Sequence, residues 1–206
     1  IFRFYTAFNE SHGFITSFIK FAVLATAGEL IGLRIRKGHY IEKGFGILPR
    51  ALVWGFLGLS IKAAFMIFGS GVPVVMAYIG VEEPAALLAG PLSAGKLLMA
   101  FSVSFFLNMI FAPVMMTLHK VTDTHIINTG GTIRGFFTRA DVSGIIGRIN
   151  WDVHWGFVLR RTIPLFWIPA HTVTFLLPVG FQVLFAALLG IVLGVILAFA
   201  ARAKSD

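Results

Sequence analysis

The run VGFQVLFAALLGIVLGVILAFAA, residues 179–201, decides the class of fold because it contains no charged residue. A helix that spans a membrane needs about 20 consecutive, mainly apolar residues. This run is that long, and Gln182 is its only strongly polar side chain. It therefore predicts a transmembrane helix.

The composition of the whole sequence extends this prediction to the rest of the chain. Of the 206 residues, 57% are hydrophobic and 13% are charged, whereas a soluble domain carries about 25% charged residues. There is no cysteine, which excludes disulfides, thiolate metal sites and a cysteine nucleophile. The net charge of +8 suits membrane topology and anionic lipid headgroups, so we expect no nucleic-acid partner.

Five segments are predicted to cross the membrane: residues 14–33, 47–68, 97–118, 162–177 and 179–201. The apolar run after the second segment continues through Gly69, Gly71 and Pro73, where we expect a break or a bend. In a four-span alternative, the segment over 162–177 lies in the membrane interface. Either arrangement is an all-α, polytopic transmembrane helix bundle that forms a single transmembrane domain over residues 1–206.

The distribution of charge supports the five-span arrangement. Most of the basic residues lie in the regions 34–46, 119–161 and 202–206, whereas the region 82–96 carries two acids and one lysine. Five crossings place the three basic regions on one side of the membrane. Positive charge collects on the inner side, so these regions are predicted to face inward.

An amphipathic helix is predicted over residues 141–161. Apolar residues recur there at helical spacing, and Asp141 suits the N-cap position. A helix of this kind lies on the membrane surface with its tryptophans in the headgroup layer and its basic side chains reaching phosphates. The residues predicted to contact lipid headgroups or the interface are Arg34, Arg36, Lys37, Trp151, Trp155, Arg160 and Arg161.

Polar side chains within or near the predicted spans are the candidates for function. An ionisable group in hydrocarbon is costly, and it usually faces the bundle interior or a water-filled cavity. Glu29 and Lys62 could pair, since consecutive spans are usually neighbours. Three interpretations stay open, namely a structural pair or interface snorkelling, a polar pore or solute path, and a proton relay. The candidates for a pore lining are Glu29, Lys62, Asn108, His171 and Gln182.

Two Gly-x-x-x-Gly patterns indicate close helix packing. They are Gly28 with Gly32 in the first span and Gly190 with Gly194 in the last. Small residues four apart let two helix backbones approach closely. The patterns favour packing inside the chain, with homo-oligomerisation as the alternative.

No motif indicates catalysis, a metal or a cofactor. Residues 119–125, HKVTDTH, hold two histidines and an aspartate, but their spacing does not match a metal site, and we expect a solvated loop there. The glycine-rich INTGGTIRG lacks the lysine-serine ending of a phosphate loop. No serine-histidine-acid set or pair of carboxylates stands out, so we do not expect an enzyme.

Four stretches together resemble one known family. They are a glycine-acid pair in the first span, Phe-Ala-Pro in the third, the Asn-Trp start of an amphipathic helix, and a Trp, Pro, Phe and Pro pattern in the segment 167–178. These stretches are similar to the family of Mpv-seventeen and the twenty-two-kilodalton peroxisomal membrane protein, small polytopic proteins of mitochondrial inner and peroxisomal membranes. The residues that carry the resemblance are Gly28, Glu29, Phe111, Ala112, Pro113, Asn150, Trp151, Trp167, Pro169, Phe175 and Pro178.

The resemblance covers most of the chain and implies a low-selectivity channel or solute-permeability role in an organelle membrane. The sequence departs from the family pattern where Leu107 replaces an acid and Gln182 replaces an arginine. These changes leave fewer polar side chains for the lining of a pore, which would also suit a protein that serves as a scaffold. We therefore carry two hypotheses, a channel and a non-catalytic accessory subunit of a larger membrane complex such as a respiratory assembly.

The expected location and partners of the protein follow from these hypotheses. The family's location makes the mitochondrial inner membrane the first expectation, with a peroxisomal or bacterial inner membrane as alternatives. The expected partners are a lipid bilayer with anionic lipids and, beyond it, either other membrane-complex subunits or further copies of the chain.

Overall fold

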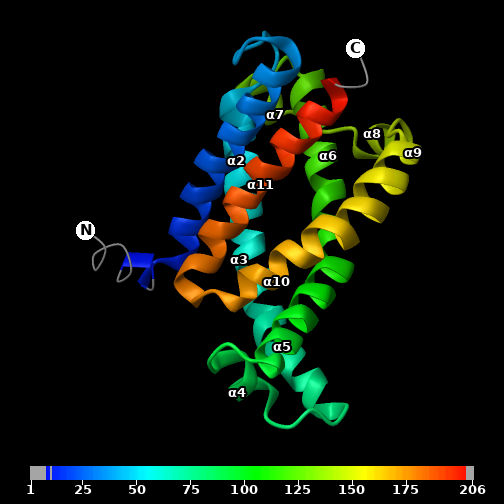
Figure 1. The fold of residues 1–206 in the computed structure, drawn as a ribbon. Helices are drawn as coiled ribbons and strands as arrows, with labels where there is room; N and C mark the ends of the chain where they lie inside the picture. The colour runs from blue at the N-terminus through cyan, green and yellow to red at the C-terminus, as the bar shows by residue number, and fades with distance from the viewer. Residues whose placement is uncertain (1–7, 10, 203–206) are drawn as a thin grey trace. The chain divides into compact units, whose positions relative to one another are not determined.

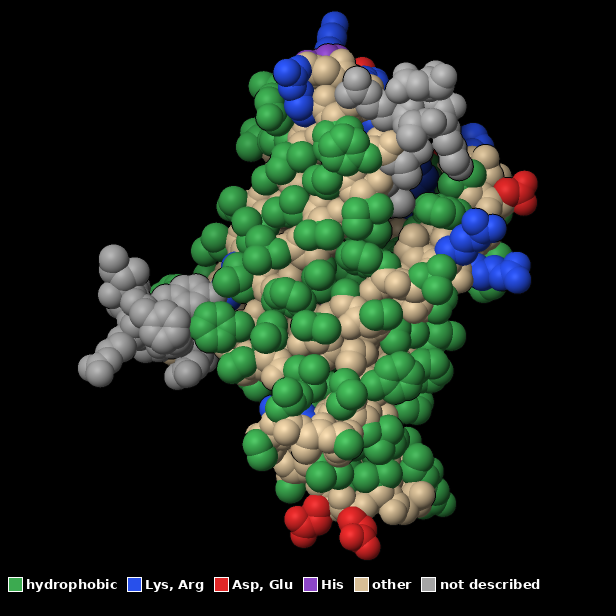
Figure 2. All heavy atoms as spheres, viewed as in Figure 1, with side chains coloured by type: hydrophobic (Ala, Val, Ile, Leu, Met, Phe, Trp, Pro, Cys, Tyr) green, Lys and Arg blue, Asp and Glu red, His purple; other side chains and the backbone are tan. Residues whose placement is uncertain are grey.

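The computed structural model describes residues 8–9 and 11–202, and the chain is all-α over that range (Figure 1). No strand occurs among those residues. The predicted all-α helical fold is therefore confirmed. Hydrophobic side chains cover most of the face seen in Figure 2, as is expected of helices that face lipid or other apolar surfaces.

Four described helices are long and apolar enough to cross a membrane. They are α2 (Gly13–Lys37), α3 (Ile47–Tyr78), a continuous helix over Ala94–Asn128, and the part Val179–Ile196 of α11 (Val179–Arg202). The segment 162–177, predicted as the fourth of five spans, is not among them. It belongs instead to a separate helical run described below.

The third long helix contains a π-helical turn. It consists of α5 (Ala94–Phe106), the π-helical η1 (Leu107–Phe111) and α6 (Ala112–Asn128). Pro113 lies two residues after Phe111, where η1 ends. A proline has no N–H and its ring meets the carbonyl four residues earlier, so the widened turn relieves that contact without ending the helix.

The structure corrects one prediction about loops and part of another. The expected solvated loop over residues 119–125 is helical, because Val121, His125 and Ile126 form a buried stripe at helical spacing on α6. Of the break or bend expected near Pro73, a break is absent, since α3 continues through Pro73 to Tyr78. A helix that is apolar all round gains by keeping its other backbone groups hydrogen-bonded to one another.

The predicted amphipathic helix over 141–161 is divided in the structure. Asp141 caps α8 (Val142–Gly147), as predicted, through a 2.9 Å bond from the Gly144 N–H. The chain then breaks at residues 148–150, and Asn150 caps a new helix. This helix consists of α9 (Trp151–Val153), the π-helical η2 (His154–Trp167) and α10 (Ile168–Leu176), and it passes through the predicted boundary at residue 161.

The described residues fall into two compact units. Of the described residues, unit 1 contains those up to residue 59, 118–148 and those from residue 183 on, and unit 2 contains 60–117 and 149–182. In unit 1 the two Gly-x-x-x-Gly patterns meet each other. A Cβ added to Gly28 would lie 3.0 Å from the Ile191 Cα, and one added to Gly32 would lie 3.8 Å from the Gly194 carbonyl oxygen. Three of the four glycines therefore pack inside the chain, whereas no other described atom lies within 4 Å of a Cβ at Gly190.

A second close approach in unit 1 joins two loops. Gly131, between α6 and α7 (Ile133–Phe136), has a φ of +68°, which L side chains rarely adopt. A Cβ there would lie 2.5 Å from the Gly44 carbonyl oxygen and 2.7 Å from the Gly46 nitrogen, both in the loop between α2 and α3. Glycine at this position lets the two loops touch through their backbones.

The core of unit 2 lies between the long helix and the run 151–176. Met99, Ala100 and Val103 of α5 are fully buried. A hydrophobic cluster extends this core and consists of Ala112, Leu159, Ile163 and Ile168. Unit 2 also contains the short helix α4 (Pro84–Ala89), which packs on α5.

Candidate functional site

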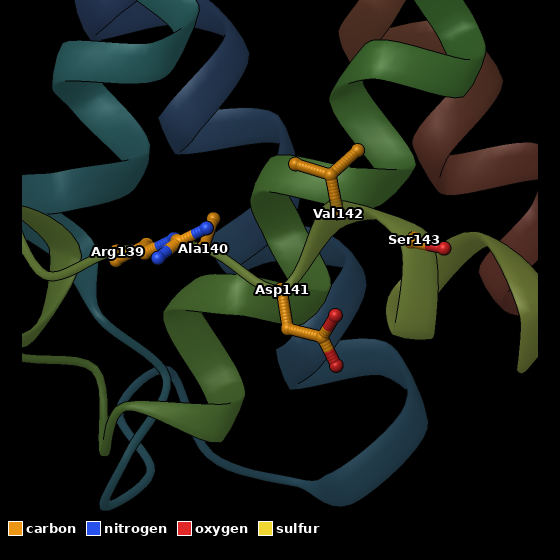
Figure 3. Close-up of a pocket in the computed structure, with 5 residues that line it drawn as sticks. All are labelled: Arg139, Ala140, Asp141, Val142 and Ser143. Atoms are coloured by element: carbon orange, nitrogen blue, oxygen red, sulfur yellow. The ribbon is translucent and has the colours of Figure 1, made fainter.

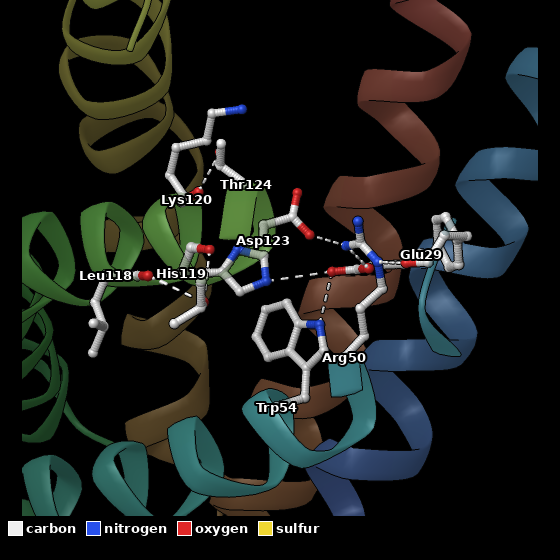
Figure 4. Close-up of polar contacts among 10 residues, drawn as sticks. Glu29, Arg50, Trp54, Leu118, His119, Lys120, Asp123 and Thr124 are labelled. Atoms are coloured by element: carbon white, nitrogen blue, oxygen red, sulfur yellow. Dashed lines mark hydrogen bonds and ion pairs between the residues drawn. The ribbon is translucent and has the colours of Figure 1, made fainter. Parts of the chain in front are cut away.

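Glu29 stands at the centre of a partly buried polar cluster in unit 1 (Figure 4). Its Oε2 accepts a 2.5 Å hydrogen bond from Arg50 Nη1, and its Oε1 accepts a 2.8 Å bond from the Trp54 indole N–H. The Nε2 of His119 lies 3.3 Å from the same Oε1. Both carboxylate oxygens of Glu29 are therefore partnered, by side chains from α3 and α6.

Arg50 connects the parts of this cluster. Its side chain is 7% exposed and forms ion pairs with Glu29 and with Asp123 of α6. Its Nε donates to the Phe45 carbonyl at 2.7 Å, and its guanidinium lies 4.3 Å from the centre of the Phe45 ring. One guanidinium thus ties α2, α3, α6 and the loop before α3 together.

We call Glu29, Arg50, Trp54, His119 and Asp123 the Glu29 cluster. The His119 ring lies against the Trp54 ring, with 4.3 Å between their centres, which holds the imidazole beside the carboxylate. Among the described residues no group of three His, Cys, Asp or Glu side chains could hold a metal ion. The arrangement is that of a structural ion-pair network linking three helices.

The suggested ion pair between Glu29 and Lys62 does not form. Glu29 pairs with Arg50, whereas Lys62 lies twelve residues further along α3, a rise of about 18 Å. Because α2 ends and α3 begins at the same side of unit 1, a residue in the first turn of α3 faces the last turns of α2. Arg50 and Trp54 share one face of α3 by their spacing of four, and this spacing was the signal that sequence reasoning missed.

Asn108 and His171 form a second polar cluster, in unit 2. The Asn108 Nδ2 donates to the Ser104 carbonyl at 2.8 Å and lies 3.1 Å from the His171 Nδ1. The Ser104 hydroxyl donates to the Ile168 carbonyl at 2.7 Å. Both residues were candidates for a pore lining, and the structure places them in direct contact. We call Ser104, Asn108 and His171 the His171 cluster.

Both ends of the Asn108 amide lie beside the His171 ring. The amide nitrogen faces the Ser104 carbonyl, because a carbonyl oxygen in that place would meet another acceptor. This nitrogen also lies 3.2 Å from the Ser104 Oγ and 3.1 Å from the His171 Nδ1, and the Asn108 Oδ1 lies 3.2 Å from the same Nδ1. His171 Nδ1 can therefore accept from the amide nitrogen or donate to the amide oxygen, depending on which ring nitrogen carries the proton.

Aromatic rings enclose His171. The Trp167 ring lies 5.2 Å away and the Phe65 ring 5.7 Å away, measured between ring centres. The indole N–H of Trp167 is buried and has no hydrogen-bond acceptor among the described residues. Such a group is uncommon in a folded protein, since an unmade bond to a buried donor costs about 1–3 kcal/mol.

The last two pore candidates occupy different settings. The Gln182 Nε2 donates to the Leu177 carbonyl at 3.0 Å and so closes the turn between α10 and α11. Lys62 is half-buried on α3. The structure thus distributes the five candidates over two units and brings only Asn108 and His171 into hydrogen-bonding contact.

All residues predicted to contact the lipid interface are exposed. At the end of α2, the Arg34 guanidinium lies 5.6 Å from the centre of the Tyr40 ring, and Lys37 forms a 2.6 Å ion pair with Glu42. The hydrogen bond from Lys37 lowers the pKa of the Glu42 carboxyl below its ordinary value. The full exposed set is Arg34, Arg36, Lys37, Trp151, Trp155, Arg160 and Arg161.

A surface pocket over residues 139–143 does not form a chemical site (Figure 3). Its only acidic group, Asp141, accepts from the Gly144 N–H and lies 3.6 Å from Arg148. The pocket is therefore the outer side of a helix cap. No family model, curated protein or solved structure matches this chain.

Proposed function

We propose that this protein is a non-catalytic structural subunit of a larger membrane assembly. One observation carries the proposal: the polar groups of Glu29, Asn108 and Gln182 are used in bonds within their own units. A water-filled pore needs polar side chains that remain available to the solute. Side chains that are bonded to their own helices instead hold a bundle in one shape.

The Glu29 cluster supports the same proposal through its energetics. Removing one member of a buried ion pair costs about 3–5 kcal/mol, because the other charge is left uncompensated. A network that joins α2, α3 and α6 in this way resists the rearrangements that gating or transport require. It suits a rigid element that other subunits pack against.

The resemblance stated above supports a location for the assembly. We propose the mitochondrial inner membrane and a respiratory assembly, because the family includes mitochondrial inner-membrane proteins and this chain departs from the family at polar positions. The exposed basic residues at the end of α2 would then contact anionic headgroups on the inner side.

The native mass of the protein in its own membrane tests the proposal. The membranes are extracted with a mild detergent, separated by native electrophoresis, and the co-migrating proteins are identified by mass spectrometry. We expect this chain in a stoichiometric complex of several different subunits. Migration alone or as a small homo-oligomer would contradict the proposal.

A channel is the second candidate, and one observation favours it. The side chains of Glu29, Asp123 and His119 keep 19%, 21% and 25% of their surface exposed, so water can reach this cluster. Ion conductance of the purified protein in planar bilayers tests the channel. A channel lined by Glu29 should change its conductance in Glu29→Gln, whereas unchanged conductance in that variant would count against it.

A further inference from the structure

Lys62 is the one basic residue near the middle of a long apolar helix. It lies about 22 Å from either end of α3 by helix rise, and its nearest chain neighbours are Ile61 and Ala63. It is half-buried and forms no ion pair within the described part of the chain. A charged group at this depth is costly, and it normally pairs with another group.

Unit 2 offers Lys62 no carboxylate at that depth. Its acidic residues are Glu82 and Glu83, which precede α4, and Asp152, at the start of the run 151–176. The two glutamates are twenty residues or more along the chain from Lys62, beyond the end of α3. The compensating charge therefore has to come from outside unit 2.

An unfilled hydrogen-bond donor lies in the same unit as Lys62. Phe65 lies one turn further along the same face of α3, and its ring contacts His171 and Phe175, with 5.7 Å and 5.0 Å between ring centres. The Trp167 ring lies 5.2 Å from the His171 ring, and its buried N–H has no acceptor among the described residues. A carboxylate oxygen is the kind of group that suits both an ammonium and an unfilled N–H donor.

We infer that Lys62 is the docking position for an acidic side chain on a transmembrane helix of a neighbouring subunit. The inference rests on the proposed function and names the chemistry of one contact in the proposed assembly. The Lys62 ammonium supplies the charge that pairs with such a carboxylate. The surrounding apolar residues keep water away, which strengthens the ion pair.

The depth of Lys62 favours a protein carboxylate over a lipid headgroup. Lipid phosphates and carboxylates lie at the two surfaces of a hydrocarbon layer about 30 Å thick. With the hydrocarbon layer centred on the 32-residue α3, Lys62 lies far from both surfaces, whereas an aspartate or glutamate can be placed at any depth by its own helix. A lipid anion is nevertheless an outcome that the experiment must separate.

The first measurement is made on the native complex. A membrane-permeant carbodiimide joins an amine to a carboxylate in direct contact, with loss of water, and mass spectrometry then identifies the linked peptides. We expect Lys62 to be linked to an aspartate or glutamate in a predicted transmembrane segment of another subunit. This measurement needs no variant, so it does not depend on whether a mutant folds.

The second measurement compares three variants expressed in place of the natural protein. Lys62→Met removes the charge, Lys62→Arg keeps it, and Lys96→Met is the matched control, because Lys96 lies at the start of α5 and donates to the Gly90 carbonyl. We expect Lys62→Met to weaken incorporation into the complex on the order of 100-fold. Lys62→Arg and Lys96→Met should incorporate close to normally.

The outcomes separate the inference from the proposed function. If the natural chain enters the complex and Lys62→Met enters it equally well, the inference fails while the proposed function stands. If native mass spectrometry finds an anionic lipid that is lost in Lys62→Met, and no peptide is linked, a lipid occupies the position and the inference is overturned. If the natural chain migrates alone, the proposed function fails first, and the inference fails with it.

Discussion

Replacing Arg50 by methionine should destabilise the protein more than any other single change in the Glu29 cluster. Methionine keeps much of the volume of the side chain but removes the guanidinium, which is 7% exposed and pairs with both Glu29 and Asp123. Two carboxylates would then share a site without their common counter-charge. Breaking a buried pair in this way costs about 3–5 kcal/mol.

The expected cost is at the low end of that range. The side chains of Glu29 and Asp123 are 19% and 21% exposed, so water compensates part of their charge. The lost bond from Arg50 Nε to the Phe45 carbonyl adds to the cost. We therefore expect a loss of about 3 kcal/mol, which lowers the ratio of folded to unfolded protein roughly 150-fold.

The assay is reversible unfolding in mixed micelles of a mild detergent and dodecyl sulfate, followed by far-ultraviolet circular dichroism. The control is the triple variant that adds Glu29→Gln and Asp123→Asn to Arg50→Met. It removes the uncompensated charges, so we expect it to be more stable than Arg50→Met alone. A loss below about 1 kcal/mol in Arg50→Met, or a triple variant less stable than the single one, would refute the reasoning.

Three further changes test other parts of the structure. Gly131→Ala should cost at least about 2 kcal/mol in the same unfolding assay, because its positive φ and the facing backbone leave no room for a Cβ. Gly28→Ala should lower the free energy of unfolding by about 2 kcal/mol. In the matched variant Gly190→Ala the added Cβ meets no described atom, so we expect it to stabilise the protein by about 0.5–1 kcal/mol. Equal effects of the two variants would contradict the packing of Gly28. Removing the Lys37 side chain should raise the pKa of Glu42 towards the ordinary value of 4.5, which an NMR titration measures. An unchanged pKa would show that the ion pair between Lys37 and Glu42 is absent. Since that pKa is lowered in the folded protein, the contact stabilises at neutral pH and is lost as the pH falls.

The class of fold could be predicted from the sequence because it depends on long-range averages. The runs that became α2, α3 and α11 are apolar over many turns, and no local choice of partner changes that result. The glycine patterns at Gly28 and Gly194 were also visible, since close packing needs small residues at fixed spacing. Helix ends were harder, because they depend on single residues such as Asn150, whose side chain caps a new helix within a stretch predicted to be continuous.

The partners of polar residues could not be predicted because they depend on which helix ends lie together. An isolated Glu29 in a span is costly, and the nearest cation within the next span was expected to be Lys62. The structure shows that the first turn of α3, rather than its middle, meets that part of α2, which gives the role to Arg50. The error has a consequence for Lys62. Lys62, which could have paired with Glu29, is left without a carboxylate in unit 2 at its own level of α3. An ammonium near the middle of an apolar helix then has to obtain its counter-charge elsewhere. Because Arg50 already neutralises Glu29 within the chain, Lys62 is the residue at which a charged group of a partner subunit is expected.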